Sequence, residues 1–384
     1  MRILIILTYY SPYTSGLTLY AVRQANALAA RGHQVTVLTS RYEAKFPLKE
    51  MLDGVEVIRV PVVAQLNKAA VMPGLLWQAV KLISRADVVN LHLPQMDGAP
   101  LAALSRLLGK PVVITYHCDL HLPPGALNRV IDQVSAIANL VAGLFANLIA
   151  PTSQDYADNS PFLKRYRKKL RVVDVPVILP QVTGAQVEAL RARWGIEPRQ
   201  PVIGMVGRLA AEKGVEYLIA SVPAVLTRYP QARVIFVGNY QNVLGEEAYA
   251  QRLAPLIAQL GQHWTFVGRI SDEELAAFFK LCDLTVLPSL NSTEGFGMVQ
   301  IESMISGTPA VGSDLPGVRV PVRITGMGKI VPPGDAKALG AAMVEILDHK
   351  DRFVGNISEL AHRFSPQTNA ENYEDIFRKV ITKR

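Results

Sequence analysis

Residues 283–313 read "DLTVLPSLNSTEGFGMVQIESMISGTPAVGS", in which two short β-rich runs enclose a helical run. The expected strands are 283–289 and 308–313, and the expected helix lies between them around 298–306. Strands that are apolar throughout and separated by helices are typical of a parallel sheet covered on both faces. The stretch therefore predicts a strand–helix–strand unit of an α/β fold.

The same alternation runs through the rest of the chain and restarts once. In the first half the expected strands are residues 2–8, 34–40, 55–62, 87–94, 111–117, 147–151 and 170–177. In the second half they are residues 201–207, 232–238, 264–268, 283–289, 308–313 and 329–333. A helix is expected over 19–33, with Gly32 at its C-terminal cap. The pattern predicts two doubly wound α/β domains.

At 384 residues the chain is too long for one ordinary core, which agrees with two domains. We expect an N-terminal domain over 1–178, a linker rich in proline and glycine over 179–200 and a second domain over 201–365. A C-terminal helix over 366–384 is expected to pack back toward the N-terminal domain. Ligands of doubly wound sheets bind beyond the carboxyl ends of the strands, so we expect the two domains to face each other across a cleft.

The N-terminal stretch, the cysteines and the net charge indicate the compartment and the kind of partner. "MRILIILTYYSP" has too short an apolar run for a leader peptide and predicts a first strand. Cys118 and Cys282 are far apart in sequence and predict two buried thiols in a reducing compartment. The net charge of +8 favours an anionic partner, such as phosphate, an acidic membrane surface or nucleic acid.

Residues 134–150 are uncharged and almost long enough to span a bilayer. Ser135, Asn139, Gly143 and Asn147 interrupt the run, and its end resembles a strand entering a loop. A buried helix followed by a strand is the favoured interpretation, with a membrane-embedded element as the alternative.

Two carboxylates in the opening stretch need an explanation, because burying an unpaired carboxylate is costly. Glu294 precedes the predicted helix, and Glu302 lies about one turn inside it. The free N–H groups at the helix start suit a phosphate; they belong to residues 295–298, namely Gly295, Phe296, Gly297 and Met298. Glu302 then suits the vicinal hydroxyls of a ribose, and Glu294 points toward whatever lies beyond the phosphates. An alternative is that Glu302 only pairs with a cation elsewhere in the fold.

The segment "VGRLAAEKGVEYLI" (206–219) places two cations directly after the first strand of the second domain. Arg208 and Lys213 offer a planar fork and a point charge, a pair suited to a diphosphate. A solvated loop with a Glu212–Lys213 pair is the alternative. Two hydroxyl-binding carboxylates, a phosphate site and two cations together describe a nucleotide-sugar site.

Several ordered motifs carry a family resemblance over nearly the whole chain. They are "YYSPYTSGLTLYAVRQANALAARGHQVTVLT" (9–39), "VGRLAAEKGVEYLI" (206–219), "FVGRISDEELAAFFKLCDLTVLPS" (266–289), the Glu-x7-Glu pair around "GFG" (294–302) and "TGMGKIVPPGDAKAL" (325–339). Together they resemble the retaining glycosyltransferases of family 4, in glycosyltransferase group 1. The resemblance implies the GT-B fold of two Rossmann-like domains and hexosyltransferase activity of class EC 2.4.

The resemblance also implies roles for single residues. Glu302 would hold the ribose hydroxyls, Glu294 would hold the hydroxyls of the donor sugar, and Arg208 with Lys213 would neutralise the diphosphate leaving group.

Four further residues take implied roles on the same basis. Gly16 would let its loop approach the phosphates. Arg269 and Ile270, in the turn after Gly268, would contact the base. His117 matches a histidine that reaches the donor sugar near its reacting carbon, although a core histidine would be equally common at the end of a strand.

The chain departs from the family pattern at three places. The usual double glycine of the first loop is Ser15–Gly16, which bears on the acceptor side. The usual Pro-Asn-Gly turn is absent from 172–180, which bears on the hinge. Val320–Pro321 stand where the family commonly has a glutamate.

No required metal or cofactor is expected, because the sequence has no Asp-x-Asp pair and "CDLHL" (118–122) does not supply one. The donor would be a UDP- or GDP-sugar. The acceptor hydroxyl would attack from the side of the leaving group, so the configuration would be retained.

Residues 164–171, "KRYRKKLR", carry six cations. They predict peripheral contact with anionic lipid headgroups, with a solvated helix face as the alternative. The resemblance favours a glycan or lipid-linked acceptor in cell-envelope glycan biosynthesis. It implies a cytoplasmic protein, peripheral on the inner face of the membrane. Nucleic acid is not expected as a partner, because Tyr166 is the only aromatic residue in the basic segment.

Three other functions remain open at this point. A nucleotide-sugar epimerase of the same fold would need further acid–base groups, for which His117 and Asp119 are the candidates. A non-catalytic sugar-nucleotide-binding subunit would not need Glu294, Glu302, Arg208 and Lys213 intact. A Rossmann dehydrogenase is the least favoured, because residues 8–19 contain only Gly16 of the required glycine pattern.

Overall fold

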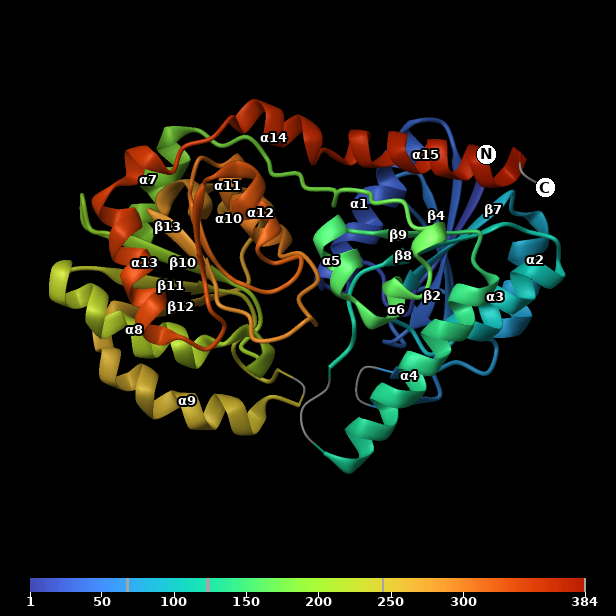
Figure 1. Ribbon diagram of the computed structural model, residues 1–384, viewed down its shortest axis with the longest axis horizontal. Coiled ribbons are helices and arrows are strands. Elements are labelled where there is room, and N and C mark those ends of the chain that lie inside the picture. Colours follow the sequence, from blue (N-terminus) through green and yellow to red (C-terminus); the bar gives the residue numbers. More distant parts are fainter. Residues whose placement is uncertain (67–68, 122–124, 244, 383–384) are drawn as a thin grey trace. The chain divides into compact units, whose positions relative to one another are not determined.

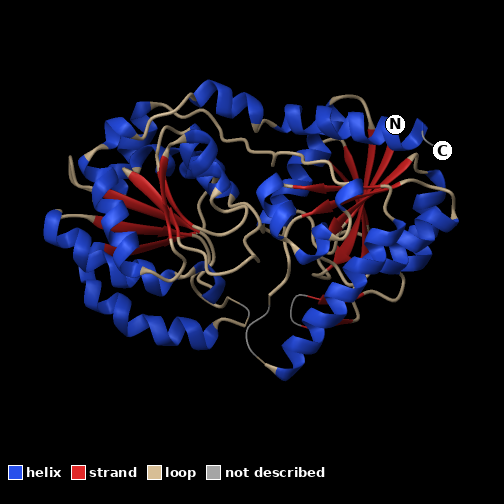
Figure 2. Cartoon of the chain, in the orientation of Figure 1, coloured by secondary structure: helices blue, strands red, loops and turns tan. Residues whose placement is uncertain are grey.

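The computed structural model describes residues 1–66, 69–121, 125–243 and 245–382. The chain forms two compact units. Unit 1 comprises Met1–Pro176 and Phe364–Arg384, and unit 2 comprises Val177–Arg363. Each unit is a sheet with helices on both faces (Figure 1, Figure 2).

Unit 1 contains a seven-stranded sheet in the order β3-β4-β2-β1-β7-β8-β9. Its strands are β1 (Arg2–Ile6), β2 (Gln34–Arg41), β3 (Lys49–Leu52), β4 (Val55–Pro61), β7 (Val88–Leu93), β8 (Val112–Tyr116) and β9 (Leu148–Pro151). All neighbouring strands are parallel except β3 and β4. Without β3, the order is that of a Rossmann fold, reversing between β1 and β7. A small hairpin, β5 (Ala64–Leu66) with β6 (Ala69–Val71), is separate from the sheet.

The sequence analysis missed the antiparallel edge strand β3. Asp53 and Gly54 join it to β4, and both have positive φ angles, of 48° and 82°. Asp-Gly is the strongest short-range signal of a two-residue hairpin turn, so the sequence did contain the necessary information.

The helices of unit 1 cover both faces of its sheet (Figure 1). They are α1 (Gly16–Ala30), α2 (Leu75–Arg85), α3 (Gly98–Leu107), α4 (Ala126–Phe145), α5 (Gln154–Asn159), α6 (Pro161–Lys164), the 3-10 turn η1 (Arg167–Lys169) and the C-terminal α15 (Pro366–Thr382). Helix α1 ends as expected at Gly32, which has φ +83° and donates to Ala29 O, while the next N–H, of His33, donates to Leu28 O. This Schellman arrangement satisfies carbonyls that the helix end leaves open.

The C-terminal helix α15 packs against α1 within unit 1 (Figure 1). The buried hydroxyls of Tyr20 and Tyr373 lie 3.1 Å apart. At the other end of α1, Arg31 and His33 bond the carboxylate of Glu374. The Arg31 hydrogen bond, followed by that from His33, lowers the pKa of Glu374 to about 2. Two buried hydroxyls and a charged cluster therefore fix α15 on unit 1.

Two expectations for unit 1 need correction. Residues 170–177 form no strand, and only Leu170 makes a bridge, to Ile149, while Arg171 and Val173 donate to the carbonyls of β9. The segment is extended, but its pairing ends too soon for a strand. Of the two cysteines, Cys282 is buried, but Cys118 is partly exposed.

Residues 134–150 form the end of α4 and the strand β9, so the predicted helix and strand are confirmed. The helix is not buried as expected, because Ile137 and Leu144 are 60% and 66% exposed. In the described part of the chain, no helix has the length and apolar character needed to cross a membrane.

Unit 2 contains a six-stranded, fully parallel sheet in the order β12-β11-β10-β13-β14-β15, again the Rossmann order. Its strands are β10 (Val202–Val206), β11 (Arg233–Val237), β12 (Trp264–Gly268), β13 (Leu284–Leu287), β14 (Ala310–Ser313) and β15 (Gly328–Val331). Its helices are α7 (Gly184–Arg193), α8 (Val215–Arg228), α9 (Glu247–Leu260), α10 (Asp272–Leu281), α11 (Met298–Ile305), α12 (Val320–Thr325), α13 (Ala336–Asp348) and α14 (Ile357–Arg363), with 3-10 turns at Ala211–Lys213, Gly261–His263 and Lys350–Arg352.

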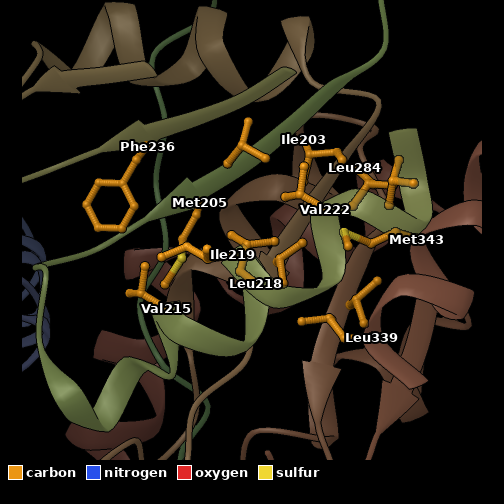
Figure 3. Packing of buried hydrophobic residues seen from close by; sticks show 14 of the residues in the cluster. Ile203, Met205, Val215, Leu218, Ile219, Val222, Phe236, Leu284, Leu339 and Met343 are labelled. Carbon is orange, nitrogen blue, oxygen red and sulfur yellow. The ribbon is translucent and has the colours of Figure 1, made fainter. Parts of the chain in front are cut away.

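Helices α8 and α13 pack together on one face of the unit 2 sheet. Figure 3 shows Leu218 and Val222 of α8 beneath Ile203 of β10, with Leu339 and Met343 of α13 beside them. These side chains are almost completely buried. Packing of this kind fixes where β10 ends and where α8 begins, and that point positions the site.

Residues 179–200, expected to be a linker, belong to unit 2. They contain α7, which a capping box between Thr183 and Gln186 begins. Val187 and Leu190 of α7 are buried in a core cluster with α10. The prolines and glycines of this stretch suggested a linker, but the apolar face of α7 packs into the core of unit 2.

Candidate functional site

The expected anion-binding residues of unit 2 follow two adjacent strands. Arg208 and Lys213 come after β10, and Glu294 comes after β13, its neighbour in the sheet. The strand order reverses between these two strands, because β11 and β12 lie on one side of β10, and β14 and β15 lie beyond β13. Doubly wound folds bind ligands at this topological switch point.

The loops after β10 and β13 lie in direct contact. Gly214 has φ +63°, and a Cβ there would lie 2.1 Å from the carbonyl oxygen of Pro288. The N–H of Leu290 donates to the carbonyl of Glu212 at 2.9 Å. Only glycine allows this approach in this conformation, so Gly214 sets the spacing of the two loops.

Two ion pairs join the charged residues of this site. Lys213 Nζ donates to Glu294 Oε2, and an Arg208 guanidinium N–H donates to Glu212 Oε1 at 2.6 Å. The alternative pair, Glu212 with Lys213, is therefore not what forms. A guanidinium has five donors and an ammonium three, so each cation can hold its carboxylate and still bind a phosphate oxygen.

Helix α11 begins beside this cluster. Gly297 at its N-cap has φ +79°, and no side chain caps the helix. The first turn holds no acidic residue, so the partial positive charge of the helix start is not neutralised there. Gly295 and Phe296 are buried, while Met298 is partly exposed at the first helical position. The side chain of Phe296 thus belongs to the core, and only its backbone can face a ligand.

Glu302 lies in the second turn of α11 and is 5% exposed. A carboxylate this deeply buried in an apolar helix is costly unless it has partners. Glu302 lies one turn beyond the start of α11, as predicted from the sequence.

The turn after β12 contains Arg269, which is exposed, and Ile270, which is partly buried. Gly268 accepts from the N–H of Gly238, and Leu209 donates to Asn239 O, so the ends of β12, β11 and β10 are linked. The ring of Tyr240, just beyond β11, stacks on Phe266 of β12 at 4.3 Å between centroids, which also joins the ends of these two strands.

In unit 1, Gly16 is the first residue of α1 rather than part of a loop. Ser15 is the N-cap and accepts a hydrogen bond from the N–H of Thr18 at 3.2 Å. A cap of this type is worth about 1 kcal/mol. Ser15, which stands where the family pattern has a glycine, therefore supplies the capping hydroxyl of α1.

His117 follows β8 and lies next to a second histidine that sequence reasoning did not single out. His92, in the neighbouring strand β7, is fully buried, and its Nδ1 lies 3.0 Å from Nε2 of His117. The rings are stacked, and the edge of Tyr20 meets His117 at 4.9 Å. Burial lowers the pKa of His117 to about 3, and burial followed by the nearby His117 lowers the pKa of His92. Both rings are therefore neutral, and one donates to the other.

Asp119 has hydroxyl partners that hold it in place. It accepts from Tyr116, Ser160 and Tyr156 at 2.7, 2.9 and 3.1 Å. Burial raises the pKa of both tyrosines, which keeps them protonated donors. This arrangement joins β8 to α5 and α6 and leaves Asp119 a structural acceptor.

A metal would need several ligands close together. Within the described ranges, no group of three or more histidine, cysteine or acidic side chains is placed to hold one.

Comparison with known proteins identifies the family. The profile "Glycosyltransferase Family 4" matches residues 14–177, and "Glycosyl transferases group 1" matches residues 186–370. The chain belongs to glycosyltransferase family 4 and is a transferase of class EC 2.4 with the GT-B architecture of two Rossmann-like domains.

Individual relatives are distant. A phosphatidyl-myo-inositol mannosyltransferase of Mycolicibacterium smegmatis is 24% identical, over 95% of this chain and 90% of its own. A D-inositol 3-phosphate glycosyltransferase of Nocardioides is 27% identical, over 95% and 85%. Among solved structures, Anabaena HepE with UDP-glucose has a TM-score of 0.79 at 21% identity, over 99% and 100%. Sucrose-phosphate synthase of Thermosynechococcus elongatus has a TM-score of 0.77 at 22% identity, over the whole of both chains.

Proposed function

We propose that this chain transfers a sugar from a UDP- or GDP-sugar to an acceptor hydroxyl with retention of configuration. The observation that carries the proposal is that two ion pairs, Arg208–Glu212 and Lys213–Glu294, lie in the contacting loops after β10 and β13 at the switch point of unit 2, and that the second loop leads into the uncapped start of α11. The cations and the helix start suit a diphosphate, and Glu302 suits the ribose beyond it. Glu294 would hold hydroxyls of the sugar, and the turn at Arg269 and Ile270 would contact the base.

The proposed chemistry is mainly electrostatic. Cleaving the bond between the anomeric carbon and phosphate leaves negative charge on the diphosphate, which Arg208, Lys213 and the start of α11 would stabilise. Preorganised charges of this kind usually lower an activation barrier more than any other single effect. The acceptor hydroxyl would attack from the leaving-group side. We propose that these groups act without a required metal. His117, being neutral, would serve as a hydrogen-bond partner of the substrate rather than as an acid.

On the acceptor side we propose a lipid-linked or glycan substrate and peripheral contact of residues 164–171 with the inner face of the cell membrane. The curated relatives are named for phosphatidyl-myo-inositol, D-inositol 3-phosphate and 2-deoxystreptamine, so family membership does not select one acceptor. A lipid-linked acceptor agrees with the six cations and would place the enzyme in cell-envelope glycan synthesis.

The other functions receive less support. An epimerase would need Asp119 or His117 as an acid or base, but three hydroxyls hold Asp119 and His117 is a weak base. A non-catalytic binding subunit would give no reason to keep both ion pairs at the switch point.

The test is stabilisation of the purified chain by UDP, GDP, ADP and NAD, followed by transfer assays with the matching sugars. A ligand at 100 times its dissociation constant adds about 2.7 kcal/mol to the free energy of unfolding. We expect stabilisation by one nucleoside diphosphate, lost in Glu302→Ala and kept in the exposed control Glu345→Ala. Binding without any transfer would favour the non-catalytic subunit, and equal binding by Glu302→Ala would reject the site.

A further inference from the structure

The outer face of α4 in unit 1 is apolar where a surface helix is normally polar. Residues 133–147 carry no charged side chain. Ile137 and Leu144, seven residues apart on the same face, are 60% and 66% exposed, and Val134 and Phe145 extend the stripe. The usual pattern is an apolar stripe toward the core and charge toward solvent.

The inner face of the same helix carries polar side chains. Ser135 and Asn139 are buried, on the side where an apolar stripe would be expected. Burying polar groups while exposing Ile137 and Leu144 is unfavourable in water. The arrangement becomes favourable once a second apolar phase covers the outer face.

Neighbouring helices also expose large apolar side chains. Helix α3 packs between α2 and α4, in a row on one face of the sheet (Figure 1). At the end of α3, Leu107 is 84% exposed, and on α2, Trp77 is 69% exposed. Lys81 lies over the Trp77 ring at 5.0 Å. Tryptophan with a flanking lysine is typical of the water–lipid boundary.

The basic segment 164–171 is fixed to the C-terminal end of α4. Lys169 Nζ donates to the carbonyls of Gly143, Leu144 and Ala146 at 3.0, 2.9 and 2.8 Å. The ring of Tyr166 lies so close to Gly143 that a Cβ there would be 2.5 Å away, and its hydroxyl donates to the Leu140 carbonyl. The cations therefore lie at the end of the apolar stripe and not merely near it in sequence.

The remaining cations of this segment are exposed and have no carboxylate partner among the described residues. They are Lys164, Arg165, Arg167, Lys168 and Arg171. Exposed apolar side chains next to unpaired cations fit a partner with an apolar interior and an anionic outer layer. A bilayer containing anionic phospholipid is such a surface.

We infer that the outer face of α4 and the basic segment 164–171 form a docking surface on which unit 1 lies in the interface of an anionic bilayer. A second copy of this chain fits less well, because a symmetric contact would bring the basic segment close to its own equivalent. The inference rests on the proposed function, in which the acceptor is lipid-linked. The docking surface would hold the enzyme on the membrane that contains this acceptor.

Vesicle co-sedimentation of the full chain tests this surface. The probes are vesicles of phosphatidylcholine with phosphatidylglycerol and vesicles of phosphatidylcholine alone. We expect sedimentation with the anionic vesicles only, weakened by added NaCl. The double variant Ile137→Glu with Leu144→Glu, and the double variant Arg167→Glu with Lys168→Glu, should each lower the partition coefficient about tenfold or more.

The controls carry the same changes on exposed positions of unit 2. Val354→Glu with Ile357→Glu matches the apolar pair, and Lys337→Glu with Arg352→Glu matches the cations. Both controls should sediment like the unchanged chain. All variants should keep their unfolding midpoint, because the altered side chains are exposed.

Three outcomes would overturn the inference. They are no sedimentation with anionic vesicles, equal sedimentation of the α4 variant, or a dimer in size-exclusion chromatography that the α4 variant dissociates. Vesicle binding requires no donor, so its failure is distinct from failure of UDP or GDP to stabilise the chain.

Discussion

Lys213 and Glu294 form an ion pair although 81 residues separate them in the sequence. Each lies just beyond the carboxyl end of one of two adjacent parallel strands, β10 and β13. Their side chains are largely buried, at 19% and 16% exposed. The pair therefore joins the two loops and holds a cation and a carboxylate at fixed positions before any substrate arrives.

Replacing Lys213 with alanine tests this pair. The change leaves Glu294 poorly solvated and unpaired, so the free energy of unfolding should fall by about 1–3 kcal/mol. The transfer rate should fall by roughly 10²–10³, because a charge that stabilises the leaving group is lost. Lys329→Ala is the matched control, because its pair with Glu345 is exposed and should contribute less than about 1 kcal/mol. Urea unfolding and initial rates measure both effects, and equal losses in the two variants would contradict the proposal.

The spacing of the same two loops depends on Gly214. Gly214→Ala adds a Cβ at φ +63°, 2.1 Å from Pro288 O. Gly195→Ala is the control, because Gly195 has φ +58° but nothing within 4 Å of the added Cβ. The control should lose only the conformational cost of about 1–2 kcal/mol. Gly214→Ala should lose about 1–3 kcal/mol more and bind nucleoside diphosphate more weakly. Urea unfolding measures the loss of stability and calorimetric titration measures the binding of nucleoside diphosphate. Equal stability losses and equal affinities in the two variants would refute the role of Gly214.

Much of the fold could be predicted from the sequence because its strands are apolar on both faces. "PVIGMVG", "ARVIFVG" and "WTFVG" each contain a strand of unit 2, with ends shifted by no more than a residue or two. Edge elements were harder to predict. Residues 49–52 are two charged side chains followed by two apolar ones, without the alternation of a half-buried strand, so β3 gave little signal apart from its Asp-Gly turn.

Pairings across the sheets could not be predicted, because they depend on strand order. The sequence placed Lys213 and Glu294 in one nucleotide-sugar site, but it did not indicate that β10 and β13 are neighbours or that the two side chains pair. In the same way, His92 is prominent only because β7 lies beside β8, which brings it to His117. The start of α1 at Gly16 depended on the cap from Ser15, which outweighed the expectation of a loop.

Metal removal tests the proposed electrostatic mechanism. If Arg208, Lys213 and the start of α11 suffice for the leaving group, excess EDTA should leave the initial rate of transfer unchanged. Restoring Mg²⁺ or Mn²⁺ should then add less than about twofold, far below the effect of losing one charged group. A loss of rate with EDTA that Mg²⁺ or Mn²⁺ reverses would show that a divalent ion shares this role.

The two histidines of unit 1 should make stability depend on pH. Their pKa values are lowered in the folded chain, to about 3 for His117, whereas an unfolded histidine titrates near about 6.5. Below about pH 6.5 the unfolded chain therefore binds protons that the folded chain does not, so the free energy of unfolding falls as pH falls. The slope approaches about 1.4 kcal/mol per pH unit for each histidine.

Urea unfolding between about pH 5 and pH 8 measures this slope. His92→Gln removes one of the two titrating groups, so the slope of the free energy of unfolding below about pH 6.5 should be roughly halved. Above that pH the free energy of unfolding should still not change with pH. His362→Gln is the control, because His362 is exposed on α14 and the slope should not change. The pKa of Glu374 is about 2 in the folded chain, so the stability that this carboxylate provides is lost only at pH values below the measured range, and it does not add to the slope there. An unchanged slope in His92→Gln would mean that the pair is charged in the folded chain, and His117 would then be available as an acid.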